Sequence, residues 1–160
     1  TNFNLTGYAD VPVSTMFSVQ PGISIQGKGA KYFDNGTNQV EDNILVVEVP
    51  VNLLANLSAG PGHVYLGGGP YAGFNVSGKR KYITNSSTTD AKLNIGNKNG
   101  DDLKGLDFGL NLLLGYQLNT GLNFGVGYGF GLTNLKPTST SNTNVQQNNR
   151  VASFTVGYAF

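Results

Sequence analysis

The chain lacks the residues from which several classes of functional site are built. It has no cysteine, so neither disulfide bonds nor thiolate metal sites can form, and an exported location is allowed. Charged residues make up only 12%, about half of the share usual in soluble domains. The net charge is +1 and there is no basic stripe interleaved with aromatic residues, which argues against nucleic acid as a partner.

Long apolar runs are also missing. The longest unbroken apolar stretch is residues 44–47, whereas a transmembrane helix needs roughly 18 apolar residues or more. The first residues, TNFNLTGYAD, have neither the basic nor the apolar region of a signal peptide, so in an exported protein that peptide has already been removed. A membrane protein of this composition has to cross the bilayer with strands, which are only half apolar.

What the chain does contain is glycine, aromatic residues and a period of two. Its 23 Gly, 8 Tyr and 9 Phe, together with many β-branched residues, are typical of a folded chain and not of a disordered one. Apolar residues occupy every even position from Leu106 to Leu118, and only Leu113 at an odd position breaks the alternation. After an Asn-Thr-Gly turn the even positions are apolar again from Leu122 to Leu132. Residues 152–160 repeat the pattern. The alternation predicts antiparallel strands joined as hairpins.

Earlier segments alternate in the same way with more irregularity. They are residues 3–11, 17–28, 43–57 and 63–77, which brings the total to about seven strands in one domain spanning residues 1–160. The connections alternate in length. Residues 12–15, 58–62 and 119–121 are short turns, whereas residues 33–42, 78–104 and 135–149 are expected to be long, mobile surface loops.

The composition of the two strand faces indicates which face meets which solvent. The polar face consists of Gly, Asn, Ser, Thr and Gln, whereas a soluble barrel should show Lys and Glu there. We therefore predict an all-β, small antiparallel up-and-down transmembrane β-barrel of a Gram-negative outer membrane, with a soluble lipocalin-like barrel as the alternative. The residues expected to face lipid are Phe108, Leu110, Leu112, Phe124, Val126, Tyr128, Phe154, Val156 and Tyr158, with Tyr116, Tyr158 and Phe160 near the periplasmic rim.

Orientation and closure follow from the same pattern. Outer-membrane barrels have short periplasmic turns and longer extracellular loops, which places the C-terminus in the periplasm and the long loops outside the cell. Seven strands is an odd number, and the first and last would both run downward. An eighth strand between them is therefore expected for closure, supplied by residues upstream of Thr1 or by a partner chain.

Four charged residues fall on the inward face, namely Asp10, Lys28, Glu48 and Asp107. A charge inside a narrow barrel has to be paired or hydrogen-bonded. We expect a polar network that fills the lumen, and a proton or ion pathway is the alternative.

Candidates for chemistry at a site are few. His63 is the only histidine and falls in a short turn, where a polar surface residue is the simpler interpretation than a catalytic base. The acidic pairs at residues 41–42 and 101–102 lie in predicted loops. No catalytic residue, cofactor site or metal site is therefore predicted. The cluster Lys79, Arg80 and Lys81 lies just beyond a strand end and could contact lipopolysaccharide phosphates or simply be solvated.

The strands also resemble a known family. The segments FSVQPGISIQGKGAKY, VEVPVNLLANL, YLGGGPYAGFNVSGK, LDFGLNLLLGYQL, GLNFGVGYGFGLTNL and RVASFTVGYAF are similar to the Bacteroidota outer-membrane β-barrel domains that include PorT-like proteins. Members usually begin with a Gly-rich strand before the segment that corresponds to residues 3–11, and this sequence does not contain it. Tyr158 and Phe160 resemble the C-terminal signal that the barrel assembly machinery reads.

The resemblance implies a function without catalysis and without cofactors. We expect a scaffold or binding barrel in contact with outer-membrane lipid and lipopolysaccharide, within a larger outer-membrane assembly of the secretion or motility type. A small channel is the second expectation, and a lipid-modifying enzyme is the third.

Overall fold

The computed structural model of the chain describes residues 2–34, 38–84, 87–96, 98, 101–135 and 148–160. The described residues form strands and connecting segments, and no helix among them is long and apolar enough to cross a membrane. The strands are β1 (Phe3–Tyr8), β2 (Val11–Pro12), β3 (Phe17–Asp34), β4 (Asn38–Ala59), β5 (Gly62–Thr84), β6 (Ser87–Lys92), β7 (Leu106–Leu118), β8 (Leu122–Gly131) and β9 (Arg150–Tyr158).

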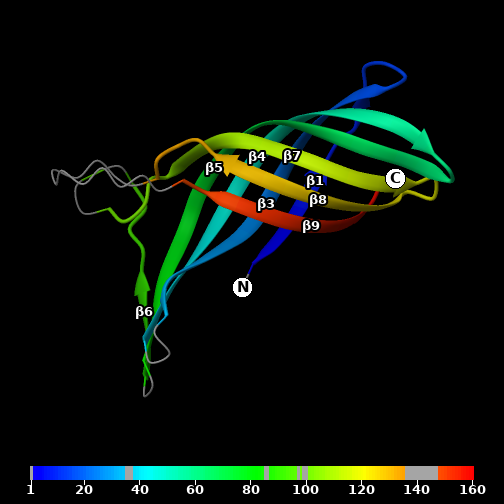
Figure 1. Ribbon diagram of the computed structural model, residues 1–160. Helices are drawn as coiled ribbons and strands as arrows, with labels where there is room; N and C mark the ends of the chain where they lie inside the picture. The colour runs from blue at the N-terminus through cyan, green and yellow to red at the C-terminus, as the bar shows by residue number, and fades with distance from the viewer. Residues whose placement is uncertain (1, 35–37, 85–86, 97, 99–100, 136–147) are drawn as a thin grey trace.

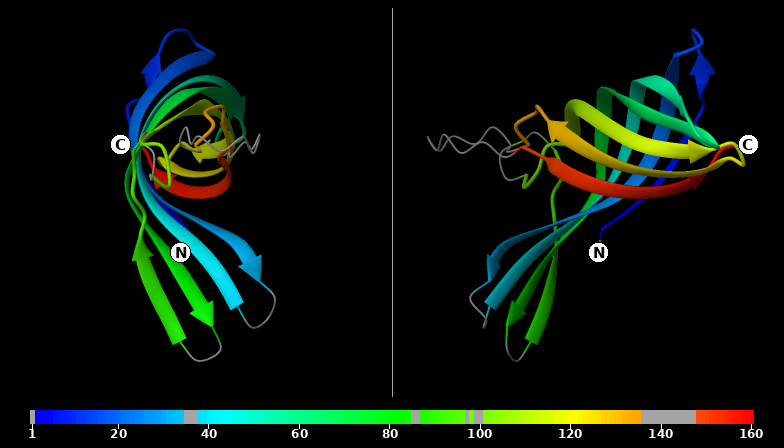
Figure 2. Two further views of the ribbon diagram at one scale, coloured as in Figure 1. Left: turned by 90° about the vertical axis from the view of Figure 1, so that its left-hand side faces the viewer. Right: turned by 45° about the vertical axis from the view of Figure 1, so that its right-hand side comes forward.

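The strands form one antiparallel sheet that curves into an open half-barrel. Its order is β1-β3-β4-β5-β7-β8-β9, with β2 paired to β3 and β6 paired to β5. Figures 1 and 2 show the sheet wrapping around a central space. In the described part of the chain no ladder joins β1 to β9, so these two strands are the edges of the main sheet. This confirms the predicted antiparallel β-barrel architecture with seven main strands.

Tight turns at one end set the register of the hairpins. Only two residues separate β4 from β5, and Gly60 there has φ 58°. The turn between β7 and β8 ends in Gly121 with φ 94°. Positive φ is readily adopted by glycine because it has no Cβ, and this accounts for glycine at both turns.

At the opposite end the structure corrects the sequence analysis. Residues 33–42 and 78–104 are predicted to be long loops, but β3 and β4 take up most of the first range, and β5 and β6 take up residues 78–84 and 87–92 of the second. Pairing continues from Asn38↔Thr84 to Ile44↔Gly78 between β4 and β5, and from Lys79↔Lys92 to Thr84↔Ser87 between β5 and β6. The result is a four-stranded extension made of β6 and the adjoining ends of β3, β4 and β5. Figure 2 shows it projecting beyond the barrel. The third predicted loop, residues 135–149, lies mostly outside the described residues.

Burial in the barrel is inverted relative to a soluble protein. Among the described residues, buried polar side chains outnumber buried apolar ones. The buried polar residues are Ser18, Ser24, Asp42, Glu48, Asn52, Asp107 and Asn123. Large apolar side chains are instead exposed along every main strand. Soluble monomers rarely expose contiguous apolar patches larger than a few hundred Å². The apolar face therefore requires an apolar solvent.

Candidate functional site

Three of the four charges predicted to face inward lie on the concave face of the sheet, which we call the lumen. Lys28 on β3 and Glu48 on β4 form an ion pair, with Nζ 3.4 Å from Oε2 and with 11% and 5% of their side chains exposed. On β7, Asn111 donates from Nδ2 to Oε1 of the same Glu48 at 3.3 Å. Through its two carboxylate oxygens Glu48 on β4 therefore connects β3 with β7.

Asp107 forms the second half of this lumen cluster. It is only 1% exposed, and its Oδ2 accepts hydrogen bonds from Tyr71 Oη and from Asn149 Nδ2, each at 3.2 Å. Its Oδ1 has no hydrogen-bond partner in the described part of the chain. The Lys28 ammonium lies 5.7 Å from the centre of the Tyr71 ring, which connects the two halves of the cluster.

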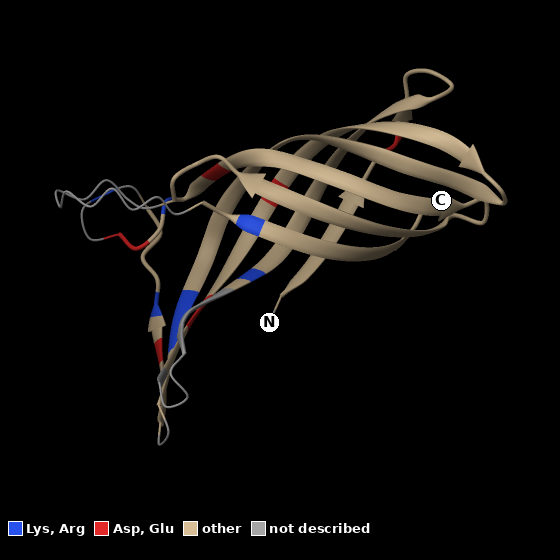
Figure 3. Cartoon of the chain, viewed as in Figure 1, with Lys and Arg blue, Asp and Glu red and all other residues tan. Residues whose placement is uncertain are grey.

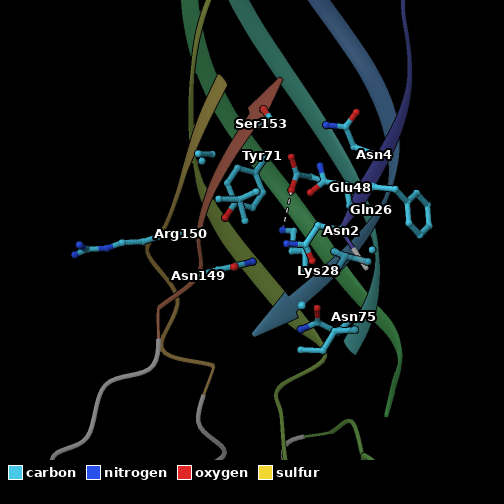
Figure 4. Close-up of a pocket in the computed structure, with 18 of the residues that line it drawn as sticks. Asn2, Asn4, Gln26, Lys28, Glu48, Tyr71, Asn75, Asn149, Arg150 and Ser153 are labelled. Carbon is cyan, nitrogen blue, oxygen red and sulfur yellow. Dashed lines mark hydrogen bonds and ion pairs between the residues drawn. The ribbon is translucent and has the colours of Figure 1, made fainter. Parts of the chain in front are cut away.

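The cluster lies beside a cavity of about 720 Å³. Its polar lining is rich in carboxamides, and Figure 4 shows several of them pointing toward the Lys28–Glu48 pair. Leu103 and Leu135 contribute an apolar part of the wall. Residues at the start of both edge strands, β1 and β9, also line the cavity, so it lies at the gap between these edges.

Asp10 is the predicted inward charge that the structure does not bring to the cluster. It is exposed in the link between β1 and β2, because β1 ends at Tyr8 and the alternation stops there. The lumen contact at that end comes from Tyr8, whose Oη accepts from Asn123 Nδ2 at 3.2 Å. Asn111, Asn123 and Asn149 are lumen residues that the sequence analysis did not single out. The one indication in the sequence was that Asn111 and Asn123 stand on the polar face of their alternating segments.

Two tyrosines fill space that inward-facing glycines leave open. The ring of Tyr65 lies against Gly115 and Gly125 on β7 and β8, and a Cβ at either glycine would collide with it. Tyr71 lies against Gly109 in the same way. The glycines of β7 and β8 are therefore complementary in shape to the large side chains of β5, the strand that adjoins β7.

The outward face carries the residues predicted to contact lipid. All nine are exposed, from 36% at Tyr128 to 69% at Phe154. Tyr116 is only partly exposed and donates from Oη to the Ala59 carbonyl at 2.7 Å, close to the short turn between β4 and β5. Tyr158 and Phe160 are exposed near the C-terminus and contact each other edge to face, with ring centres 5.2 Å apart.

The basic cluster at residues 79–81 is divided between the two faces of the extension. Arg80 donates to both oxygens of Asp42, at 2.7 Å from Nε and 2.8 Å from Nη2, and Asp42 is only 3% exposed. These hydrogen bonds raise the pKa of Arg80 above its ordinary value, so the guanidinium stays charged and committed to Asp42. Lys79 and Lys81 lie on the other face, where Lys79 is directly opposite Lys92. Figure 3 shows charged residues gathering toward this end of the molecule.

The histidine and the acidic pairs lie apart from the lumen cluster. His63 is at the turn end of β5, opposite Ser58 and Gln117. Asp107 on β7 is opposite Gly73, which lies ten residues further along β5. Asp42 pairs with Arg80, and Asp101 and Asp102 hydrogen-bond to backbone groups of their own loop. Among the described residues there is no group of three or more His, Asp or Glu side chains that could hold a metal ion.

Comparison with known proteins agrees with the architecture. Residues 1–137 match the family described as outer membrane protein beta-barrel domain, a range that covers every strand except β9. No curated protein matches the chain. The inverted burial and the antiparallel half-barrel are what this family requires of a chain that folds in a bilayer. The chain therefore belongs to the family of outer membrane protein beta-barrel domains and is an integral protein of the outer membrane.

Proposed function

We propose that this barrel is a non-catalytic scaffold or binding subunit of a larger outer-membrane assembly. The observation that carries the proposal is the four-stranded extension. It continues the barrel sheet beyond the lipid-facing strands, and all six residues of β6 at its edge are exposed. Because its strands are hydrogen-bonded into the barrel wall, the extension is a rigid surface on which a partner protein could dock.

The resemblance to PorT-like proteins of Bacteroidota supports an assembly of the secretion or motility type. The hairpin lengths support an orientation with the extension outside the cell and the C-terminus in the periplasm, because outer-membrane barrels have their short turns on the periplasmic side. The terminal pair Tyr158 and Phe160 would then be presented to the barrel assembly machinery from the periplasm.

Co-purification from mild detergent tests the proposal. A matched variant replaces residues 82–89 with Asn-Gly, so that Lys81 and Asp90, which pair in the native ladder, flank a two-residue hairpin turn. The native protein should retain partner proteins, and the shortened variant should fold as a barrel and lose them. A lone monomer under every mild condition would count against membership of an assembly.

A small channel is the second candidate, and the polar cavity is the observation that favours it. Opposed to it are the Tyr65 and Tyr71 rings that fill the lumen and the Leu103 and Leu135 side chains at the cavity wall. Conductance across a planar bilayer separates the two functions. Discrete current steps from the purified barrel would support the channel, and their absence would support the scaffold.

We also propose that the extension contacts lipopolysaccharide through Lys79 and Lys92, because Lys81 lies between Glu41 and Asp90 in the ladders. Arg80 is excluded from this role because both carboxylate oxygens of Asp42 already accept hydrogen bonds from its guanidinium. Lys79 and Lys92 lie opposite each other, and like charges in this position repel each other unless an anion lies between them. A lipid phosphate would supply that anion.

A further inference from the structure

We propose that the lumen cavity binds a small organic cation, a primary amine whose N–H groups meet carboxamide and carboxylate oxygens. The cavity volume of about 720 Å³ lies within the range of roughly 300–1,000 Å³ that is usual for small-molecule sites. The inference goes beyond the scaffold function and does not depend on membership of an assembly.

The orientation of three lining carboxamides is fixed by their partners. Asn111 donates to Glu48, Asn149 donates to Asp107, and Asn75 donates from Nδ2 to the Lys104 carbonyl at 2.7 Å. Carboxylates and backbone carbonyls only accept hydrogen bonds, so each amide nitrogen has to point toward its partner and each amide oxygen away from it. Among the described residues, none donates to these three oxygens. At these three positions the cavity wall therefore presents oxygen acceptors, beside lining donors such as the Lys28 ammonium.

The charges of the lumen cluster are also unequal. Glu48, which lines the cavity, and Asp107, which lies behind the lining, are two carboxylates, and Lys28 is the only ammonium among the described lining residues. Arg150 is at the rim, but its side chain points away from the cavity in Figure 4. Asp107 lies behind Tyr71 and Asn149, two neutral lining residues that donate to its Oδ2, and no described residue donates to its Oδ1. A buried negative charge of this kind favours a positively charged ligand.

Lys28 shows how an ammonium is held in this environment. Its Nζ lies 3.4 Å from Glu48 and 5.7 Å from the centre of the Tyr71 ring, so a carboxylate and an aromatic face bind the same cation. A ligand amine would meet the same kind of surface and would compete with Lys28 for Glu48. Removal of the Lys28 charge should therefore strengthen binding, an outcome that a purely structural ion pair would not produce.

The test compares two probes of equal length, 1,4-diaminobutane and 1,4-butanediol, by calorimetric titration of the full-length protein in detergent. The diamine should bind at least about tenfold more tightly than the diol, because only the diamine carries the charges that the carboxylates attract. Equal affinity for the two probes, or no measurable binding of the diamine, would overturn the proposal.

Variants assign the binding to the cavity. Lys28→Met should strengthen diamine binding by about tenfold, because Glu48 loses its internal competitor. Lys92→Met makes the same change on the exposed extension and should leave the affinity unchanged. Glu48→Gln should weaken binding. If folded Lys28→Met protein, verified by circular dichroism, bound the diamine more weakly than the native protein, the cavity would not be the site.

Discussion

Tyr65 occupies its part of the lumen because two glycines on neighbouring strands leave room for its ring. At Gly125 a Cβ would collide with the Tyr65 hydroxyl, and its next contact is with the Leu114 carbonyl at 3.5 Å. Gly125→Ala should therefore destabilise the barrel by about 1 kcal/mol, within the lower range for an overpacked interior. Tyr65→Phe in the same chain should recover most of this loss.

Urea unfolding in lipid vesicles measures both effects. Gly7→Ala is the control, since its Cβ would meet nothing within 4 Å. Gly115→Ala should not be rescued by Tyr65→Phe, because its Cβ also collides with the Phe124 carbonyl, which is backbone. Equal stability of Gly125→Ala and native protein would mean that Tyr65 does not pack as described.

The sequence predicts the lumen charges at this scale but not their partners. Alternation along β3, β4 and β7 places Lys28, Glu48 and Asp107 on the inward face, and the structure brings them there. Asp10 follows the end of β1, where alternation carries no information about direction. Asn149 comes from a polar stretch without any pattern. Its contact with Asp107 depends on how strands distant in sequence meet, and local spacing does not encode that.

At the scale of the element, β8 tests where the lipid lies. Val126 is near its middle and 51% exposed on the outward face. Val126→Arg should cost about 2 to 4 kcal/mol in vesicles if this position is near the bilayer midplane, and the cost should fall to about 0 to 1 kcal/mol near an interface. Leu132→Arg, just after β8 and 66% exposed, supplies the comparison. Equal costs at the two positions would contradict a depth-dependent lipid contact.

The extension tests the proposed lipopolysaccharide contact. Lys79→Gln with Lys92→Gln should weaken binding of lipopolysaccharide by roughly 2 kcal/mol in total, about 1 for each lysine, and dephosphorylated lipopolysaccharide should show no such difference. Arg80→Gln should leave the affinity unchanged and lower stability by about 1 to 3 kcal/mol, because the buried Asp42 loses its partner. The opposite pattern, with Arg80 essential for binding, would contradict the assignment.

Strand predictions succeed where one face is apolar and fail where both are polar. The alternation gives both bounds of β7 and the start of β8. In the extension, β6 reads STTDAK and has no apolar face, so nothing in its pattern separates a strand from a loop. Its pairing with β5 is a cross-strand property, visible only once the register is known.

For the whole molecule, the two edges of the half-barrel raise the question of closure. Every neighbouring pair in the main sheet is antiparallel, so β1 and β9, six steps apart, run in the same direction. Direct pairing of these edges would be parallel, and so would pairing with an edge of a second copy in the same orientation. We propose that one further strand, antiparallel to both, lies between them in the barrel wall, completes an even-numbered barrel and closes the open side of the lumen cavity.

Hydrogen exchange on the full-length protein in vesicles tests this closure. Unpaired amide groups in hydrocarbon cost several kcal/mol each, so an open edge is not expected to persist in a membrane. The amides on the outer edges of β1 and β9 should exchange as slowly as those of β4, which is paired on both sides. Rapid exchange along both edges would mean that the half-barrel stays open. A continuous parallel ladder between β1 and β9 would be a second contradicting result, because the edges would then pair without a further strand.

The central claim is that the outward face of the sheet meets lipid while the inward face encloses a polar lumen. Since the chain has no cysteine, single cysteines can be introduced along β8 and β9 and spin-labelled in vesicles without further changes. Labels at Phe124, Val126 and Tyr128 should collide with dissolved oxygen and be shielded from a water-soluble nickel complex, and labels at Ser153 and Thr155, on the less exposed face of β9, should be shielded from oxygen. Equal access of the nickel complex to both sets would contradict the account, because the apolar face would then lie in water.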